Sequence, residues 1–292
     1  MMLFKGSGVA LITPFDEMLE VNYEALEKLI IWHIEMGTDA LVICGTTAES
    51  ATLTLEEKKQ ILAFSMKVAK HQIPIIAGTG SNNTKQSIEL SAYAKSIDVD
   101  GLLLVTPYYN KPTQRGLIAH YKEIANAVDL PIILYNVPSR TGVNLEVSTV
   151  VELSKVSNIV AIKEASHDLV QIKKIIDETD DSFTVYSGND DQTEDIIKMG
   201  GKGVISVTAN ILPKEIHEIA HQIYQGKELS EINDVMFIES NPVPVKQALN
   251  FLGFKVGSVR LPLVELTKEN ESILIETLQK FGLKESQYEN FN

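Results

Sequence analysis

The sequence is poor in cysteine, in basic residues and in long apolar runs, and each shortage excludes a class of protein. A single cysteine, Cys44, among 292 residues excludes an internal disulfide and fits a reducing cytoplasm. There are 26 Lys and Arg against 39 Asp and Glu, and the net charge of −13 argues against binding to nucleic acid or anionic membranes. No apolar stretch approaches the roughly 18 residues of a membrane-spanning helix, and no signal peptide is evident. We therefore expect a cytoplasmic protein.

What the sequence does contain is a regular alternation of short apolar runs and helical segments. Eight β-rich runs begin about 20 to 34 residues apart, which is the length of a βα unit. Because the runs are apolar on both faces, they are typical of parallel strands covered by helices. They occupy residues 9–12, 40–44, 74–77, 102–105, 132–135, 159–162, 183–186 and 204–207. Eight such units predict an α/β fold, a (β/α)8 TIM barrel. The alternative, a doubly wound open sheet, lacks the glycine-rich nucleotide loop after the first strand.

Helical periodicity fills the gaps between the runs and then continues alone. The expected barrel helices include 23–36, 54–70, 84–96, 116–128 and 145–155, and the second has a capping-box start at Thr54 and Glu57. After about residue 210 only helical segments follow, at 213–224, 229–240, 243–252 and 270–281. We predict a catalytic barrel over residues 1–224 and a small C-terminal helical domain over 225–292. No flexible linker separates them, so the C-terminal helices should pack on the barrel.

Lys163 lies in the apolar run 159–165, where a strand normally places only core side chains. Burying an ammonium is unfavourable unless the group is paired or loses its proton. A desolvated lysine has a lowered pKa, and its neutral amine is a nucleophile toward carbonyl groups. Lys163 is therefore a candidate Schiff-base residue. The alternative is a lysine at a strand end that extends to water or pairs with Glu164.

Polar residues gather where the expected strands end, which is the face of a βα barrel that carries the active site. Together they offer an amine nucleophile, hydroxyl groups for proton transfer, backbone N–H groups for a carboxylate and an arginine for a second anion. Those are the parts of a carbonyl-condensing lyase. The polar segments at these ends are 45–50, 78–82, 106–110, 135–142, 163–164, 187–190 and 205–206.

Each of these features also has an ordinary structural interpretation. Arg140 is equally well read as a surface loop charge, and a tyrosine near a strand end is often a core residue with a solvated hydroxyl. Residues 78–80, Gly-Thr-Gly, resemble a phosphate-binding loop but lack its Lys-Ser/Thr ending. Cys44 adjoins a polar turn, yet a small buried thiol at a strand end is the favoured interpretation.

Metal chemistry has little support in the sequence. His217 and His221 have the i, i+4 spacing of a helical metal-binding pair. They lie in a helical segment after the eighth strand, outside the polar segments at the strand ends. We therefore expect no metal role for this pair, and we predict no metal site and no cofactor.

The strand-end motifs resemble those of the dihydrodipicolinate synthase family, within the pyruvate-dependent class I aldolase and lyase superfamily. The similarity covers nearly the whole chain and follows the strand order. The motifs that carry it are GTTAES at 45–50, GTG at 78–80, TPYYNK at 106–111, YNVPSRT at 135–141, IKE at 162–164, SGND at 187–190 and GVIS at 203–206.

This resemblance implies a role for each matching residue. Lys163 would form an imine with pyruvate, and Tyr135 would transfer protons that Thr46 and Tyr109 relay to solvent. The second substrate would be L-aspartate 4-semialdehyde, whose carboxylate Arg140 would bind, and the product would feed diaminopimelate and lysine synthesis. Thr47 would hold the pyruvate carboxylate, and Gly188 and Ile205 would line the same pocket.

The resemblance also implies a homodimer or homotetramer, because Tyr109 would act in a neighbouring subunit. Catalysis by Tyr135 further requires partners that stabilise its ionised form, so we expect Thr46 within hydrogen-bonding reach.

The sequence departs from the family pattern at two sites. Ala48 replaces a glycine, which is harmless unless the position needs a positive φ. At the feedback site of lysine-sensitive members, Leu55, Lys58 and Gln86 replace two histidines and a glutamate. Losing a carboxylate and gaining an ammonium disfavours a cationic ligand, so we expect weak or absent inhibition by lysine.

Two other kinds of function are compatible with such a barrel. N-acetylneuraminate lyases and keto-deoxy-sugar-acid aldolases share the lysine and the tyrosine, but Arg140 favours a short carboxylated aldehyde over a sugar. A barrel reduced to a binding or regulatory role would be expected to lose some of these groups, and none is missing.

Overall fold

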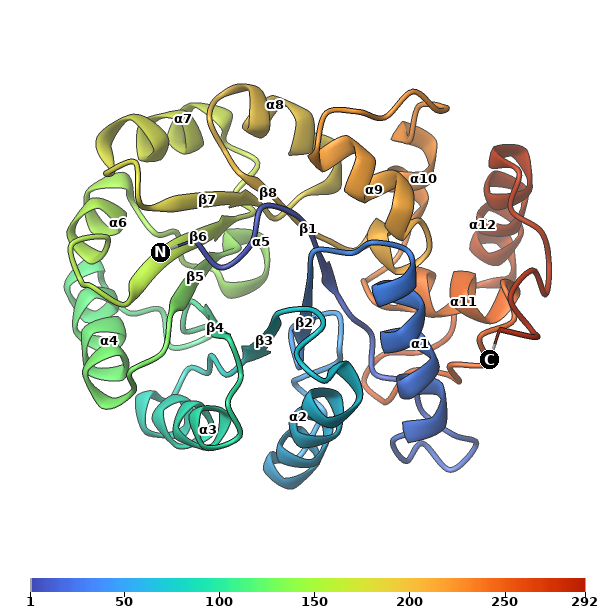
Figure 1. Cartoon of the computed structure of the whole chain (residues 1–292), viewed down its shortest axis with the longest axis horizontal. Helices are drawn as coiled ribbons and strands as arrows, with labels where there is room; N and C mark the ends of the chain where they lie inside the picture. Colours follow the sequence, from blue (N-terminus) through green and yellow to red (C-terminus); the bar gives the residue numbers. More distant parts are fainter. Residues whose placement is uncertain (1, 292) are drawn as a thin grey trace.

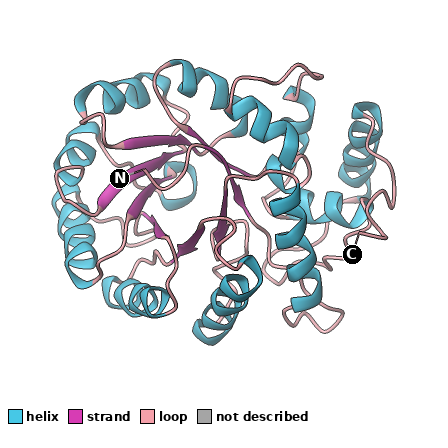
Figure 2. Cartoon of the chain, in the orientation of Figure 1, coloured by secondary structure: helices cyan, strands magenta, loops and turns pink. Residues whose placement is uncertain are grey.

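Eight parallel strands close into a barrel within residues 2–291, the part of the chain that the computed structural model describes (Figure 1). They pair in sequence order, and β8 pairs with β1 to close the ring. Helices surround the strands on the outside (Figure 2). The strands are β1 (Gly6–Ala10), β2 (Ala40–Ile43), β3 (Ile75–Gly78), β4 (Gly101–Val105), β5 (Ile132–Asn136), β6 (Ile159–Glu164), β7 (Thr184–Ser187) and β8 (Gly203–Ser206). The predicted TIM barrel is confirmed.

The first strand begins at Gly6, earlier than the run 9–12 had indicated. Gly6 and Ser7 pair with Gly203 and Val204 of β8, so the barrel closes through a glycine-rich contact. A Cβ on Gly203 would lie 1.9 Å from the Gly6 carbonyl oxygen, a separation that no side chain permits. Glycine is normally a turn signal, and here it allows two backbones to approach closely instead.

The helices follow the expected periodicity, with ends shifted by a few residues. Thr54 and Glu57 form the predicted capping box: Glu57 N–H donates to Thr54 Oγ1 at 3.2 Å, and Thr54 N–H donates to Glu57 Oε2 at 2.8 Å. Helices α5, α7 and α8 were not predicted. The barrel helices are α1 (Tyr23–Glu35), α2 (Leu55–Ala69), α3 (Thr84–Ser96), α4 (Gln114–Ala127), α5 (Pro138–Thr141), α6 (Val147–Leu153), α7 (Leu169–Glu178), α8 (Thr193–Lys198) and α9 (Pro213–Ala220).

Apolar side chains form two separate cores because successive strand residues point to opposite faces. The larger core fills the space between strands and helices. The smaller one fills the barrel interior, and its N-terminal region holds Phe4 and Tyr186, whose rings stack 4.3 Å apart. In the strand register, Lys163 lies between Tyr135 of β5 and Tyr186 of β7. This register places the lysine in the interior, near the end of its strand.

The chain ends in three helices, α10 (Ser230–Val235), α11 (Val243–Phe251) and α12 (Lys268–Phe281), drawn in orange to red in Figure 1. As predicted, this region packs on the barrel: α10 and α11 contact the segments after β7 and β8, and α12 packs on α10 and α11. Lys246 of α11 forms a buried ion pair with Glu49 after β2, and Arg260 pairs with Glu57 of α2 at 2.6 Å. The boundary between residues 224 and 225 stays a prediction. Among the described residues, no helix combines the length and apolar character needed to cross a membrane.

Candidate active site

The Lys163 side chain is buried inside the barrel and is only 5% exposed. Its Nζ lies 4.5 Å from the centroid of the Tyr135 ring. Burial lowers the pKa of Lys163 to about 8; the Asp190 carboxylate opposes this and the Arg140 guanidinium adds to it. The interpretation of Lys163 as a lysine that extends to bulk water is therefore wrong. A substantial fraction of the amine is neutral near pH 8.

Glu164, the next residue, points to the other side of the strand and does not neutralise Lys163. Its two carboxylate oxygens accept hydrogen bonds from Asn136 Nδ2, both at 3.1 Å, and Oε1 also accepts one from the Ser166 backbone at 2.9 Å. Gln171 Nε2 donates to Oε2 at 3.2 Å. Burial raises the pKa of Glu164, and these hydrogen bonds hold the carboxyl group in place. The two neighbours thus have separate environments.

Tyr135 lies beside Lys163 on β5, with its side chain buried. Burial raises the pKa of Tyr135, while the Arg140 charge and a hydrogen-bonding interaction with the Thr46 side chain lower it. Thr46 comes from the loop after β2 and lines the same cavity as Tyr135. An arginine and a hydroxyl group near the phenol are the partners that a proton-transferring tyrosine needs.

Gly188, directly after β7, borders the lysine, and Ile205 of β8 belongs to the interior core. A Cβ on Gly188 would lie 3.0 Å from Lys163 Cε and 2.7 Å from Ala165 Cβ. Only glycine leaves room for the lysine stem at this point. Ile205 is fully buried in the interior core together with Tyr135. The structure therefore brings both predicted pocket residues to the barrel interior that holds Lys163.

Asp190 is a further candidate site residue, and its role could not be inferred from the sequence. Its Oδ2 accepts hydrogen bonds from the backbone N–H groups of Val207 and Thr208, at 3.0 and 3.1 Å. Its Oδ1 is buried and has no hydrogen-bond partner among the described residues. Burial raises the pKa of Asp190, and Lys163 is the cation that lowers it. The sequence feature that could have identified Asp190 is its position directly after the seventh strand, in the SGND motif.

A cavity of about 670 Å³ opens beside Tyr135 at the C-terminal ends of β2 to β5. Thr46 and Tyr135 line it together with Arg140 of α5. Residues 240–242 and 262–263 of the C-terminal region complete the lining. Arg140 Nη2 lies 3.5 Å from the Asn241 carbonyl oxygen, so its charge is kept at the cavity wall.

Thr47 and Tyr109 do not line this cavity, in contrast to Thr46, Tyr135 and Arg140. Thr47 is buried, and its hydroxyl accepts a hydrogen bond from Asn241 Nδ2 at 3.0 Å, so the C-terminal region holds this loop. Tyr109 is 89% exposed and has a left-handed φ of 72°. The cavity is lined by Tyr108 rather than by Tyr109.

The small residues of the strand-end loops are explained by backbone packing. A Cβ on Gly78 would lie 2.4 Å from the Cys44 carbonyl oxygen, and one on Gly80 would lie 2.4 Å from the Val105 nitrogen. These glycines therefore allow the backbones of neighbouring strands and loops to approach closely. Ala48 is absent from the residues with positive φ within 2–291, so it fits its place without strain. Burial raises the pKa of the Cys44 thiol to about 12, in agreement with an inert thiol.

Comparison with known proteins gives one consistent assignment. The profile described as the Dihydrodipicolinate synthetase family matches residues 3–281. A relative from Thermoanaerobacter sp. (strain X514), named 4-hydroxy-tetrahydrodipicolinate synthase, is 53% identical over 293 residues, covering 97% of this chain and 98% of that protein.

Solved structures agree with this assignment. The crystal structure of dihydrodipicolinate synthase from Aquifex aeolicus is 47% identical, with a TM-score of 0.93, and the match covers 97% of this chain and 100% of that one. A chloride-inhibited dihydrodipicolinate synthase from Acinetobacter baumannii, complexed with pyruvate, is 45% identical with a TM-score of 0.92. That match covers 96% of this chain and 99% of the solved one.

Proposed function

The chain belongs to the dihydrodipicolinate synthetase family, and from this premise we propose that Lys163 condenses pyruvate with L-aspartate 4-semialdehyde through an imine. Its activity is that of a 4-hydroxy-tetrahydrodipicolinate synthase, a lyase of lysine and diaminopimelate biosynthesis. The observation that carries the proposed mechanism is the buried Lys163 amine, with its lowered pKa, beside the Tyr135 ring.

The first step is attack of the neutral Lys163 amine on the C2 carbonyl of pyruvate. A carbinolamine forms and then loses water, which leaves a cationic imine. The imine nitrogen withdraws electrons, so a proton leaves the pyruvate methyl group and an enamine forms. The enamine carbon attacks the aldehyde of the second substrate. The substrate amine then attacks the imine carbon, and ring closure expels the Lys163 amine.

Tyr135 moves the protons that these steps require. It protonates the carbinolamine hydroxyl as water leaves and removes a proton from the substrate amine before ring closure. Thr46 interacts with the Tyr135 side chain, which makes it the first group of a relay toward solvent. Asp190 faces the lysine as a buried carboxylate and stabilises the positive charge of the imine.

Two groups hold the substrate carboxylates. Thr47 binds the pyruvate carboxylate, partly through its backbone, and Gly188 and Ile205 complete that pocket. Arg140 binds the carboxylate of the semialdehyde, because its guanidinium lies at the cavity wall and provides two parallel N–H donors. A short, anionic aldehyde matches this charge better than a polyhydroxylated sugar does.

A second copy of the chain supplies the last relay group. Tyr109 is highly exposed and lies outside the lining of its own cavity, whereas Thr46 belongs to that lining. We infer that Tyr109 enters the relay of a neighbouring subunit in a homodimer or homotetramer. We also propose a cytoplasmic location, a barrel domain ending near residue 224 and a reaction without cofactor or metal.

The experiment that tests this function combines an assay with chemical trapping. Borohydride reduction in the presence of pyruvate should add one reduced pyruvate to the chain, on the peptide that contains Lys163. The purified protein should consume pyruvate with aspartate semialdehyde and should leave N-acetylneuraminate intact. Trapping on any other lysine, or cleavage of N-acetylneuraminate as the faster reaction, would contradict the proposal.

L-lysine should inhibit this enzyme weakly or not at all. Leu55, Lys58 and Gln86 line the cavity, where an ammonium repels the cationic side chain of lysine. The measurement is the initial rate against L-lysine concentration, and half-inhibition below 1 mM would refute the expectation. The triple variant Leu55→His/Lys58→His/Gln86→Glu should be more sensitive, because it removes the cation and adds a carboxylate.

A further inference from the structure

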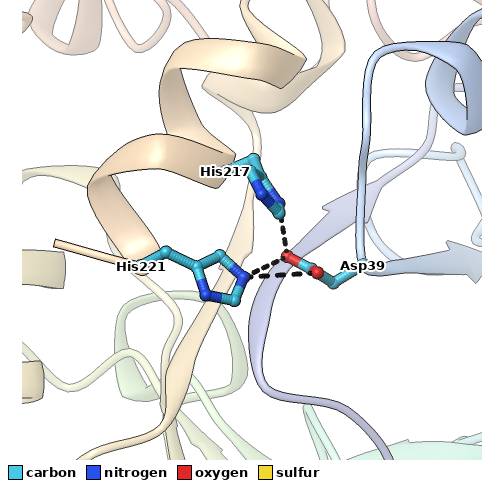
Figure 3. A group of neighbouring side chains, drawn as sticks. All are labelled: Asp39, His217 and His221. Carbon is cyan, nitrogen blue, oxygen red and sulfur yellow. Dashed lines mark hydrogen bonds and ion pairs between the residues drawn. The ribbon is translucent and has the colours of Figure 1, made fainter. Parts of the chain in front are cut away.

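A carboxylate and two imidazoles converge at the N-terminal ends of the barrel strands, on the face opposite the candidate active site. Asp39 lies directly before β2, and His217 and His221 come from α9 and its C-terminal end. Figure 3 shows the two imidazoles directed toward the Asp39 carboxylate. Asp39 and His217 are separated by 178 residues in the sequence, so only barrel closure brings them together.

The donor atoms are spaced closely enough to share one ion. His217 Nδ1 lies 2.9 Å from Asp39 Oδ2, and His221 Nε2 lies 3.2 Å from the same oxygen. All three donor atoms lie within 4.8 Å of one another. Four-coordinate zinc has bonds of about 2.0 to 2.1 Å, which requires donor separations of roughly 3.3 Å. A small adjustment of the two imidazoles would therefore complete three bonds.

The surroundings keep this cluster open and fix its carboxylate. The Ser7 backbone N–H donates to Asp39 Oδ2 at 2.8 Å, a contact that orients the carboxylate from outside. Gly6 leaves the space that the donors occupy, since a Cβ there would lie 2.1 Å from Asp39 Oδ2 and 2.5 Å from His221 Nε2. The three side chains are 21% to 29% exposed, so an ion can enter from solvent.

We propose that Asp39, His217 and His221 form a binding site for a divalent transition-metal ion of the zinc type. Two imidazoles and one carboxylate are a donor set that suits zinc, and a water molecule would fill the fourth position. The ion would join the residue before β2 to α9, and so would connect the second and the last βα units beside the β1–β8 closure of the barrel. Its role is structural, because Lys163 and Tyr135 lie at the opposite ends of the strands.

The test is binding of Zn²⁺ to the full-length protein after treatment with a chelator. The parent should bind one Zn²⁺ per chain by calorimetry and should melt at a higher temperature when loaded. His217→Ala and His221→Ala should each weaken binding by about tenfold or more, as expected for loss of a ligand. His71→Ala removes an exposed histidine elsewhere and should leave binding unchanged.

Two further measurements distinguish a metal site from a hydrogen-bonded cluster. Asp39→Asn keeps an acceptor for the Ser7 N–H and should still fold, yet it should lose Zn²⁺ affinity. Co²⁺ bound to the parent should give the intense visible absorption of a four-coordinate site, and turnover should be equal with and without Zn²⁺. Equal Zn²⁺ binding by the parent and by a His217→Ala/His221→Ala variant would overturn the proposal, as would no binding by the parent.

Discussion

Lys163→Met should lose turnover by about a thousandfold or more and should no longer be trapped by borohydride with pyruvate. Methionine has a similar volume but no amine, so neither the imine nor the enamine can form. The measurement is the steady-state rate with both substrates, together with the mass of the protein after reduction. Lys174→Met removes an exposed lysine from α7 and should leave the rate and the trapped adduct unchanged. A Lys163→Met variant as fast as the parent would disprove the mechanism.

The same amine predicts how the parent responds to pH. Only neutral Lys163 attacks pyruvate, and its pKa is about 8. The value of kcat/KM for pyruvate should therefore rise about tenfold per pH unit below pH 8 and level off above it. Trapping rates at low pyruvate should follow the same curve. A profile that stays flat between pH 6 and 8 would place the reacting lysine elsewhere.

The Lys163 amine should also make stability rise with pH, in a pH range above the one in which activity rises. Burial lowers the pKa of Lys163 from 10.5 to about 8, so the unfolded chain binds more protons between these values. The buried ammonium is thus fully destabilising below pH 8, and the penalty disappears as pH rises toward 10.5. At 1.36 kcal/mol per pKa unit it amounts to about 3 kcal/mol. In urea unfolding at pH 7, the free energy of unfolding of Lys163→Met should exceed that of the parent by up to that amount. The gain is reduced by the stabilisation that Asp190 loses when its cationic neighbour is removed.

Residues at strand ends could be predicted from the sequence because a closed parallel barrel places the C-terminal ends of all its strands on one face. Eight apolar runs fixed the strand count, and the residues after each run included Lys163, Tyr135, Thr46 and Arg140. Helix α7 was not among the predicted helices, although Leu169, Ile172 and Ile175 repeat with helical spacing.

Contacts between distant segments could not be predicted in the same way. The sequence indicated a helical tail but not which face it covers. The structure shows that Asn241 and Lys246 hold the loop after β2. Asp39 likewise meets His217 only through closure of the barrel. Periodicity reports which face of an element is buried, whereas such pairings depend on the packing of segments about 180 to 200 residues apart.

The largest stability loss should come from one of these distant contacts, the ion pair between Lys246 and Glu49. Both side chains are almost fully buried, at 2% and 1% exposure, and Lys246 Nζ lies 2.9 Å from Glu49 Oε1. The ammonium also donates to the Ser258 carbonyl at 2.5 Å and lies 4.0 Å from the centroid of the Phe15 ring. Glu49 Oε2 accepts from the Arg260 backbone N–H at 2.9 Å. The pair thus links α11 to the loop that carries Thr46 and Thr47.

Lys246→Met should reduce the free energy of unfolding by about 3 to 5 kcal/mol, because it leaves the Glu49 charge buried without its cation. Glu49 has a left-handed φ of 56°, so loss of its anchor should also displace Thr46 and lower kcat.

The double variant Glu49→Gln/Lys246→Met removes both charges and should recover most of the stability, since a neutral amide of the same shape remains. Lys280→Met is the matched control: it breaks the exposed pair with Glu231 at 2.6 Å and should change stability by less than about 1 kcal/mol. Urea unfolding of the four proteins decides the point, and a loss below about 1 kcal/mol in Lys246→Met would show that the buried pair does not hold the loop.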